Sequence, residues 1–94
     1  MDARETVERH GGYVVAGNMA AVGGDFTPEA MQAFTQLGIR PPRGTNKYEI
    51  VGESKDGDKP VYDIKYSNDQ ESLTVRSTWD KVGDEWKIVK ADKA

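Results

Sequence analysis

The sequence contains no cysteine, and this absence removes several kinds of site at once. A chain without cysteine forms no disulfide bond, holds no thiolate zinc site and has no thiolate nucleophile. It has a single histidine, His10, so a metal centre built from several imidazoles is excluded as well. The acidic residues are spread among turns, and the Asp56-Gly57-Asp58 turn lacks the later glutamate of a calcium-binding loop. We therefore expect no metal site, and nothing in the sequence calls for a cofactor.

Excess charge of one sign and long apolar runs are also missing. The 13 basic and 16 acidic residues give a net charge of −3, and both signs are interspersed. Such a surface lacks the basic face that binds nucleic acid or an anionic membrane, so neither is expected as a partner. No window reaches the roughly 20 apolar residues of a membrane span, and the N-terminal residues do not read as a signal peptide. As written, the sequence predicts a cytoplasmic protein, while export after removal of a leader before Met1 stays open.

The N-terminal part of the chain, about residues 2–38, has helical periodicity and predicts three helices. In the first helix, small and apolar residues share one side, with Glu5 and Arg9 opposite. The residues on the inner side are Ala3, Val7, His10, Gly11, Val14 and Val15. Gly11 and Gly12 each cost roughly 1 kcal/mol relative to alanine in a helix, so we expect a bend or a close backbone approach there.

Glycines and capping residues divide this helical region. Gly17 is expected to end the first helix, and a short second helix is expected over Met19–Val22, before two further glycines. Thr27 and Pro28 predict the start of a third helix, with a hydroxyl at the N-cap and proline at the first position. This helix should end at Gly38. Its inward stripe is expected to consist of Ala30, Phe34 and Leu37.

From residue 46 to about residue 92 the apolar period becomes two, which predicts four strands. The separating segments KDGDK, SNDQE and KVGDE are short, and such connections join antiparallel neighbours. The inward residues are Tyr48, Ile50, Tyr62, Ile64, Tyr66, Leu73, Val75, Trp79, Trp86 and Ile88. The sequence therefore predicts one α+β domain over residues 1–94, with three helices, a connector at residues 39–45 and a curved four-stranded antiparallel meander.

The opposite face of this sheet has a mixed composition, neither fully polar nor fully apolar. It is expected to carry Val51, Lys65, Thr74, Arg76, Thr78, Lys87 and Val89. A face of this kind leaves room for a partner protein or a second copy of the chain. We therefore interpret these residues as a candidate interface, with a homodimer as the simplest arrangement.

Trp79 and Trp86 flank the last turn, and their spacing suggests that they pair across the hairpin. We expect Trp86 to be buried, so that Trp86→Ala costs about 3 to 5 kcal/mol of stability.

Two segments, VERHGGYVVAGNMAAVGGDFTPEA and VRSTWDKVGDEWKIVKAD, resemble the nuclear transport factor 2-like superfamily of cystatin-like folds. Within it, the TPEA helix start and the KYEIVGE strand look most like a small bacterial subgroup of largely unknown function. The resemblance implies a sheet that curls around the first helix. Ketosteroid isomerases and SnoaL-like cyclases in this superfamily line a conical pocket, and His10 aligns with a helix tyrosine of the isomerases. This chain lacks the section that normally supplies the isomerase base.

Six residues are candidates for contact with a ligand in such a pocket, namely His10, Tyr13, Tyr48, Tyr62, Tyr66 and Trp79. Imidazole titrates near neutrality, so His10 could exchange a proton or a hydrogen bond with a ligand. A base needs a partner that orients it, and the first helix provides no acidic residue beside His10. The alternative interpretation is structural, because aromatic residues at strand spacing usually form the core. Arg40 and Arg43 also have two interpretations. They could bind a carboxylate or a peptide terminus in a bidentate fork, or they could be solvated loop residues.

Three functional hypotheses follow. The first is a non-catalytic interaction or accessory module that self-associates through the exposed sheet face. The second is a protein that binds a small hydrophobic ligand between the first helix and the sheet. The third is an isomerase-like or cyclase-like enzyme that uses His10, although no catalytic constellation can be assembled from the sequence.

Overall fold

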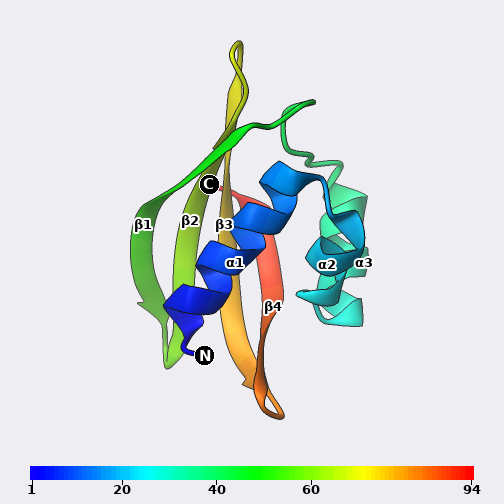
Figure 1. The fold of residues 1–94 in the computed structure, drawn as a ribbon. Helices are drawn as coiled ribbons and strands as arrows, with labels where there is room; N and C mark the ends of the chain where they lie inside the picture. Colours follow the sequence, from blue (N-terminus) through cyan, green and yellow to red (C-terminus); the bar gives the residue numbers. More distant parts are fainter.

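The computed structural model describes residues 1–94 and contains three helices followed by a four-stranded antiparallel sheet (Figure 1). The helices are α1 (Ala3–Ala16), α2 (Met19–Gly24) and α3 (Pro28–Leu37). The strands are β1 (Lys47–Asp56), β2 (Lys59–Ser67), β3 (Ser72–Val82) and β4 (Glu85–Lys93). They are hydrogen bonded in the order β1-β2-β3-β4, so the predicted α+β class and antiparallel meander are confirmed. None of the helices has the length and apolar character that crossing a bilayer requires.

Local hydrogen bonds define the helix ends that the sequence predicts. The Asp2 carboxylate accepts from the Glu5 amide at 2.8 Å, and the Glu5 carboxylate accepts from the Asp2 amide at 3.0 Å, which forms a capping box at the start of α1. Thr27 caps α3 and Pro28 is its first residue. Gly17 ends α1 with φ at 73°, a left-handed conformation that glycine adopts without strain.

The end of α2 differs from the prediction, since the helix continues to Gly24 instead of ending at Val22. This end is bound to β4. The Lys87 ammonium donates to the Gly24 carbonyl, and the Ile88 amide donates to the Asp25 carbonyl at 2.7 Å. The Thr27 amide in turn donates to the Ile88 carbonyl at 3.0 Å, so residues 25–27 form a short parallel bridge with β4. Contacts distant in sequence therefore determine where α2 stops.

The core lies between α1 and the sheet. Figure 1 shows α1 crossing in front of the strands, while α2 and α3 lie on the side of β4. Val7 on α1 meets a layer in which Ile64, Trp79 and Ile88 are at most 1% exposed. Leu37 is 53% exposed, so the prediction that it faces inward is wrong. The reason is that α3 packs mainly against the edge strand β4, and Leu37 lies beside this strand near the surface.

Gly11 confirms the predicted close backbone approach in α1. A Cβ atom at this position would lie 2.5 Å from the ring of Tyr48. The Tyr48 hydroxyl donates to Glu8 of the same helix at 3.1 Å, so this strand residue is held against α1 at both ends of its ring. Gly12, the next residue, has nothing within 4 Å of the equivalent position. The two glycines thus have different roles.

The predicted pairing of Trp79 with Trp86 is wrong. Trp79 lies opposite Ile88, and Trp86 lies opposite Lys81. The register is set by the short turn at residues 83–84, where Gly83 has φ at 65°, and the pairing shifts again between residues 78 and 79. Trp79 is consequently 0% exposed in the core, whereas Trp86 is half-buried with the Lys81 ammonium 5.7 Å from its ring centre.

Candidate functional site

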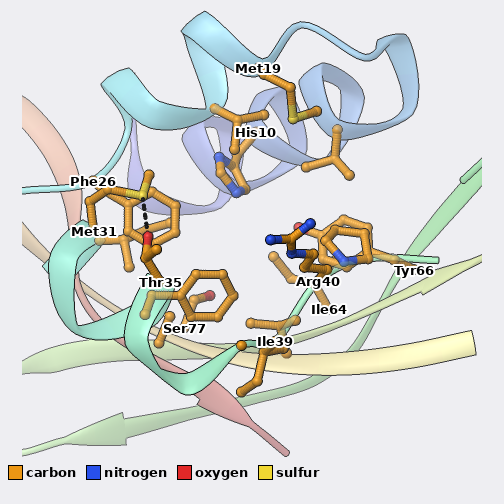
Figure 2. Close-up of a pocket in the computed structure, with 18 residues that line it drawn as sticks. His10, Met19, Phe26, Met31, Thr35, Ile39, Arg40, Ile64, Tyr66 and Ser77 are labelled. Carbon is orange, nitrogen blue, oxygen red and sulfur yellow. Dashed lines mark hydrogen bonds between the residues drawn. The ribbon is translucent and has the colours of Figure 1, made fainter. Parts of the chain in front are cut away.

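A cavity of about 300 Å³ lies between the helices and the sheet (Figure 2). Of its 18 lining residues, 12 are hydrophobic, so its interior favours an apolar occupant. The hydrophobic lining residues are Val14, Met19, Val22, Phe26, Met31, Phe34, Ile39, Ile64, Tyr66, Val75, Ile88 and Ala91. The lining side chains with other polar groups are His10, Thr35, Arg40 and Ser77.

His10 enters this cavity from α1 as half of a buried pair with Asp25. The His10 Nδ1 atom lies 2.9 Å from the Asp25 Oδ2 atom, and the two residues are only 4% and 6% exposed. On the other carboxylate oxygen, an Arg9 guanidinium nitrogen lies 3.9 Å away. Because a buried carboxylate needs hydrogen-bond donors, the Nδ1–H tautomer of His10 is the one that satisfies Asp25. In this tautomer the Nε2 atom carries a lone pair.

Aromatic rings fix the orientation of the imidazole. The Trp79 ring meets it edge-on at 5.6 Å between centroids and 82° between planes, and the Phe26 ring lies at 6.1 Å. Trp79 is itself anchored, because its Nε1–H donates to the Ser77 hydroxyl at 2.9 Å. The Ser77 hydroxyl donates onward to the Tyr62 carbonyl at 3.0 Å. Ser77 therefore supports the wall, and its donor is already used.

Besides the exposed Arg40 guanidinium, two polar atoms of the lining have no hydrogen-bond partner in the protein, the Nε2 of His10 and the hydroxyl of Tyr66. Every fully buried polar side-chain atom in the structure has a partner, so these two atoms must be accessible, and the cavity is the space next to both residues. Burial raises the pKa of Tyr66 above its usual value of 10.0, and the nearby Tyr48 and Asp25 add to the effect. The hydroxyl therefore stays protonated at neutral pH and can donate, while Nε2 can accept.

Asp25 is the functional residue that the sequence interpretation missed. It follows α2 directly, and its backbone is bound to Ile88 of β4, so its carboxylate cannot move away from His10 easily. The search for a partner of His10 considered α1 alone, whereas the partner comes from the next turn of the chain. One signal was present in the sequence, because Asp25 is the only charged residue between His10 and Glu29. An isolated charge in an apolar stretch needs a partner when it is buried.

The structure brings two of the six predicted ligand residues, His10 and Tyr66, to the cavity and places the other four elsewhere. Trp79 lies in the core behind His10, and Tyr48 covers Gly11. Tyr62 is 5% exposed, and its pKa is raised by burial and by the nearby Glu53 carboxylate. Tyr13 lies under the Arg9 guanidinium at 5.7 Å, outside the cavity lining.

The predicted interface residues are dispersed over different surroundings. Val51 is 51% exposed at a register shift of β1, and Arg76 forms a two-bond ion pair with Asp63 at 2.9 and 3.1 Å. Thr78 is only 7% exposed. The remaining positions vary, with Lys65 exposed, Thr74 half-buried, Lys87 bonded to the end of α2, and Val89 beside α3. The seven positions therefore differ in their exposure and in their contacts.

Of the two arginines in the connector, only one lines the cavity. Arg40 lines it, together with its neighbours Ile39 and Pro41. Arg43 does not, and its backbone carbonyl accepts a hydrogen bond from the Asn68 amide at 2.8 Å. Elsewhere in the chain, no group of three or more histidine, aspartate or glutamate side chains converges in a way that could hold a metal ion.

Comparison of the chain with known protein families, with curated proteins and with solved structures gives no match. The chemistry of the site is therefore derived from its geometry. The arrangement offers an apolar enclosure, an oriented acceptor at His10 and a neutral donor at Tyr66. Such a site can hold a small apolar molecule and form directional hydrogen bonds to a polar group on it.

Proposed function

We propose that this protein binds a small, largely apolar molecule in the cavity between its helices and its sheet. The observation that carries the proposal is the His10 imidazole, which the buried Asp25 carboxylate orients at 2.9 Å while its second nitrogen has no partner in the protein. Buried polar groups normally satisfy one another, so a buried imidazole with one nitrogen open to an apolar cavity favours a ligand as the missing partner.

The volume of the cavity limits the size of the ligand. At about 300 Å³ it is at the lower end of ligand-binding pockets. It is roughly twice the ~150 Å³ of an apolar cavity that is known to accept benzene. The ligand is therefore expected to be no larger than a bicyclic ring system or a chain of about ten heavy atoms. Steroids and larger polyketides exceed this size.

Two bicyclic probes test the proposal. Indole carries an N–H donor that matches the lone pair of His10 Nε2, and benzofuran has the same shape without the donor. Titration of each probe, followed by the backbone amide NMR signals of the cavity residues, is expected to give saturable shifts. Indole should bind more tightly by about three- to tenfold, since one hydrogen bond contributes about 0.5 to 1.5 kcal/mol.

A pair of variants on α3 provides the matched control. Thr35 is exposed and lines the mouth of the cavity, whereas the neighbouring Gln36 is exposed and does not line it. Thr35→Trp is expected to block the cavity and weaken probe binding at least tenfold, while Gln36→Trp leaves it unchanged. Wild-type protein that gives no saturable shift at the cavity with either probe would refute the proposal. Equal binding by the two tryptophan variants would place the probes elsewhere.

A second candidate function is proton transfer on a bound ligand, supported by the same His10–Asp25 pair. A carboxylate that holds a histidine in one tautomer, with the lone pair of its second nitrogen free, is the arrangement that a general base needs. In D2O, the His10 Nε2 atom would take a proton from an acidic C–H of a bound ketone, exchange it for a deuteron of the solvent and return that deuteron to the carbon, with 1-indanone as the probe. Exchange catalysed by the wild type and lost in His10→Gln would support this function. A wild-type rate equal to that of buffer would remove it.

The likeness to the nuclear transport factor 2-like superfamily also belongs here as a proposal. It rests on the sequence segments quoted above and is supported by the order of elements, three helices followed by a four-stranded antiparallel meander. A helix-facing cavity is consistent with the conical pocket that this resemblance implies. An experimental structure whose sheet does not curve around α1 would argue against it.

A further inference from the structure

The mouth of the cavity carries one permanent charge, and it is positive. Arg40 is the only lysine, arginine, aspartate or glutamate that lines the cavity. Asp25 is close by, but it lies behind His10 and is already bonded to it, with Arg9 at 3.9 Å from its other oxygen. Tyr66 is neutral, since burial raises its pKa. The chain as a whole has a net charge of −3, so this local positive charge runs against the overall balance.

Arg40 is free to bind a ligand. It is exposed, and none of the ion pairs in the structure includes it. Figure 2 shows its guanidinium group directed inward, between His10 and Tyr66 in that view. A guanidinium group presents a planar set of donors that matches a carboxylate with two parallel hydrogen bonds. An unpaired arginine directed into an apolar cavity is therefore suited to a carboxylate attached to an apolar body.

The backbone around Arg40 is restrained before any ligand arrives. The following Pro41 disfavours helical geometry at Arg40 and keeps it extended, and Pro42 stiffens the chain further. Ile39 and Pro41 line the cavity together with Arg40, so this part of the connector runs along its mouth. A guanidinium group on a restrained backbone loses less conformational freedom when it binds.

We propose that the ligand is a small monocarboxylate whose apolar part fills the cavity and whose carboxylate binds Arg40 in a bidentate fork. This inference rests on the proposed ligand-binding function and adds the chemical class of the ligand. A free aliphatic or aromatic acid of about ten heavy atoms has the required size and charge.

Octanoate and octanamide form a matched pair of probes that have the same number of heavy atoms and differ in charge. Their affinities are measured at neutral pH by NMR titration for the wild type and for two variants. Arg40→Gln removes the charge at the mouth. Arg43→Gln removes the same charge from the same connector but outside the cavity lining, so it controls for the general electrostatic field. Thermal melting checks that both variants are folded.

The wild type is expected to bind octanoate about tenfold or more tightly than octanamide, as a charge-assisted bidentate contact implies. Arg40→Gln should lose this preference and retain octanamide binding, while Arg43→Gln should keep it. Equal affinity of the wild type for both probes would overturn the carboxylate inference and leave the binding function standing. If the wild type binds none of the three probes octanoate, octanamide and indole, both the carboxylate inference and the binding function are overturned. Loss of the preference in Arg43→Gln to the same degree as in Arg40→Gln would also overturn the assignment to Arg40.

Discussion

Replacing each of the two adjacent glycines of α1 by alanine should change stability in opposite directions. Gly12→Ala adds a methyl group with nothing within 4 Å, in a helix interior where alanine is favoured over glycine by about 0.5 to 1 kcal/mol. We therefore expect Gly12→Ala to stabilise the protein by about that amount. Gly11→Ala gains the same helix propensity but places its Cβ 2.5 Å from the Tyr48 ring.

The size of the opposing effect at Gly11 follows from what Tyr48 must do. To relieve the contact, its ring has to move away from α1, and overpacking of this kind costs about 1 to 3 kcal/mol. The hydrogen bond from its hydroxyl to Glu8 is lost or strained at the same time, which adds up to about 1 kcal/mol. Net destabilisation by Gly11→Ala is thus expected to be about 1 to 2 kcal/mol, so the two variants should differ by about 1.5 to 3 kcal/mol.

Urea unfolding followed by tryptophan fluorescence measures this difference, because Trp79 is 0% exposed in the folded protein. The same substitution at Gly11 in a Tyr48→Ala background serves as the control. There the ring is absent, and the added methyl group should no longer be unfavourable. Equal stability of Gly11→Ala and Gly12→Ala would refute the close approach, as would destabilisation by Gly11→Ala that persists without the Tyr48 ring.

Three further predictions follow from the packing and the charges. Trp79→Ala should cost about 3 to 5 kcal/mol, and Trp86→Ala less than half of that because Trp86 is half-buried; equal losses in urea unfolding would contradict this. Because burial raises the folded-state pKa of Tyr66 above 10.0, its contribution to stability is complete below pH 10 and is lost as the pH rises further. Tyr66→Phe should therefore lose less stability than the wild type as the pH rises above about 10. If the urea midpoints of the two proteins fall equally with pH in this range, the prediction is wrong. If the exposed sheet face mediates self-association, sedimentation should give a dimer mass that Val51→Lys reduces to the monomer, and a wild-type monomer at high concentration rules this out.

The features predicted correctly from the sequence are those that neighbouring residues determine. The Thr27-Pro28 start, the left-handed glycine at residue 17 and the alternation of the strands each depend on a few adjacent side chains. The inward direction of Tyr62 and Tyr66 followed from the same alternation. These signals are strong because the period of a helix or strand repeats within one element.

The candidate site was harder to predict because its parts come from separate elements. His10 and Asp25 are 15 residues apart, and their contact depends on the path of α2 and on its attachment to β4. Alternation assigned Tyr48, Tyr62 and Trp79 to the pocket side as well, but it cannot separate the residues that line a cavity from those that fill the core beside it. The register of the last hairpin was missed for a related reason, since the turn at Gly83 determines it and not the tryptophans.

The bridge between residues 25–27 and β4 has a consequence for the order in which the protein can assemble on the ribosome. The Asp25 carbonyl cannot accept its hydrogen bond until the Ile88 amide has been synthesised. At about 5 to 20 residues per second, this takes on the order of 3 to 13 s. Until then β4 is missing, and the apolar side of α3, which packs against this strand, stays uncovered. A nascent chain arrested before Ile88 should therefore be a better chaperone substrate than the longer one, and it should not yet hold a ligand.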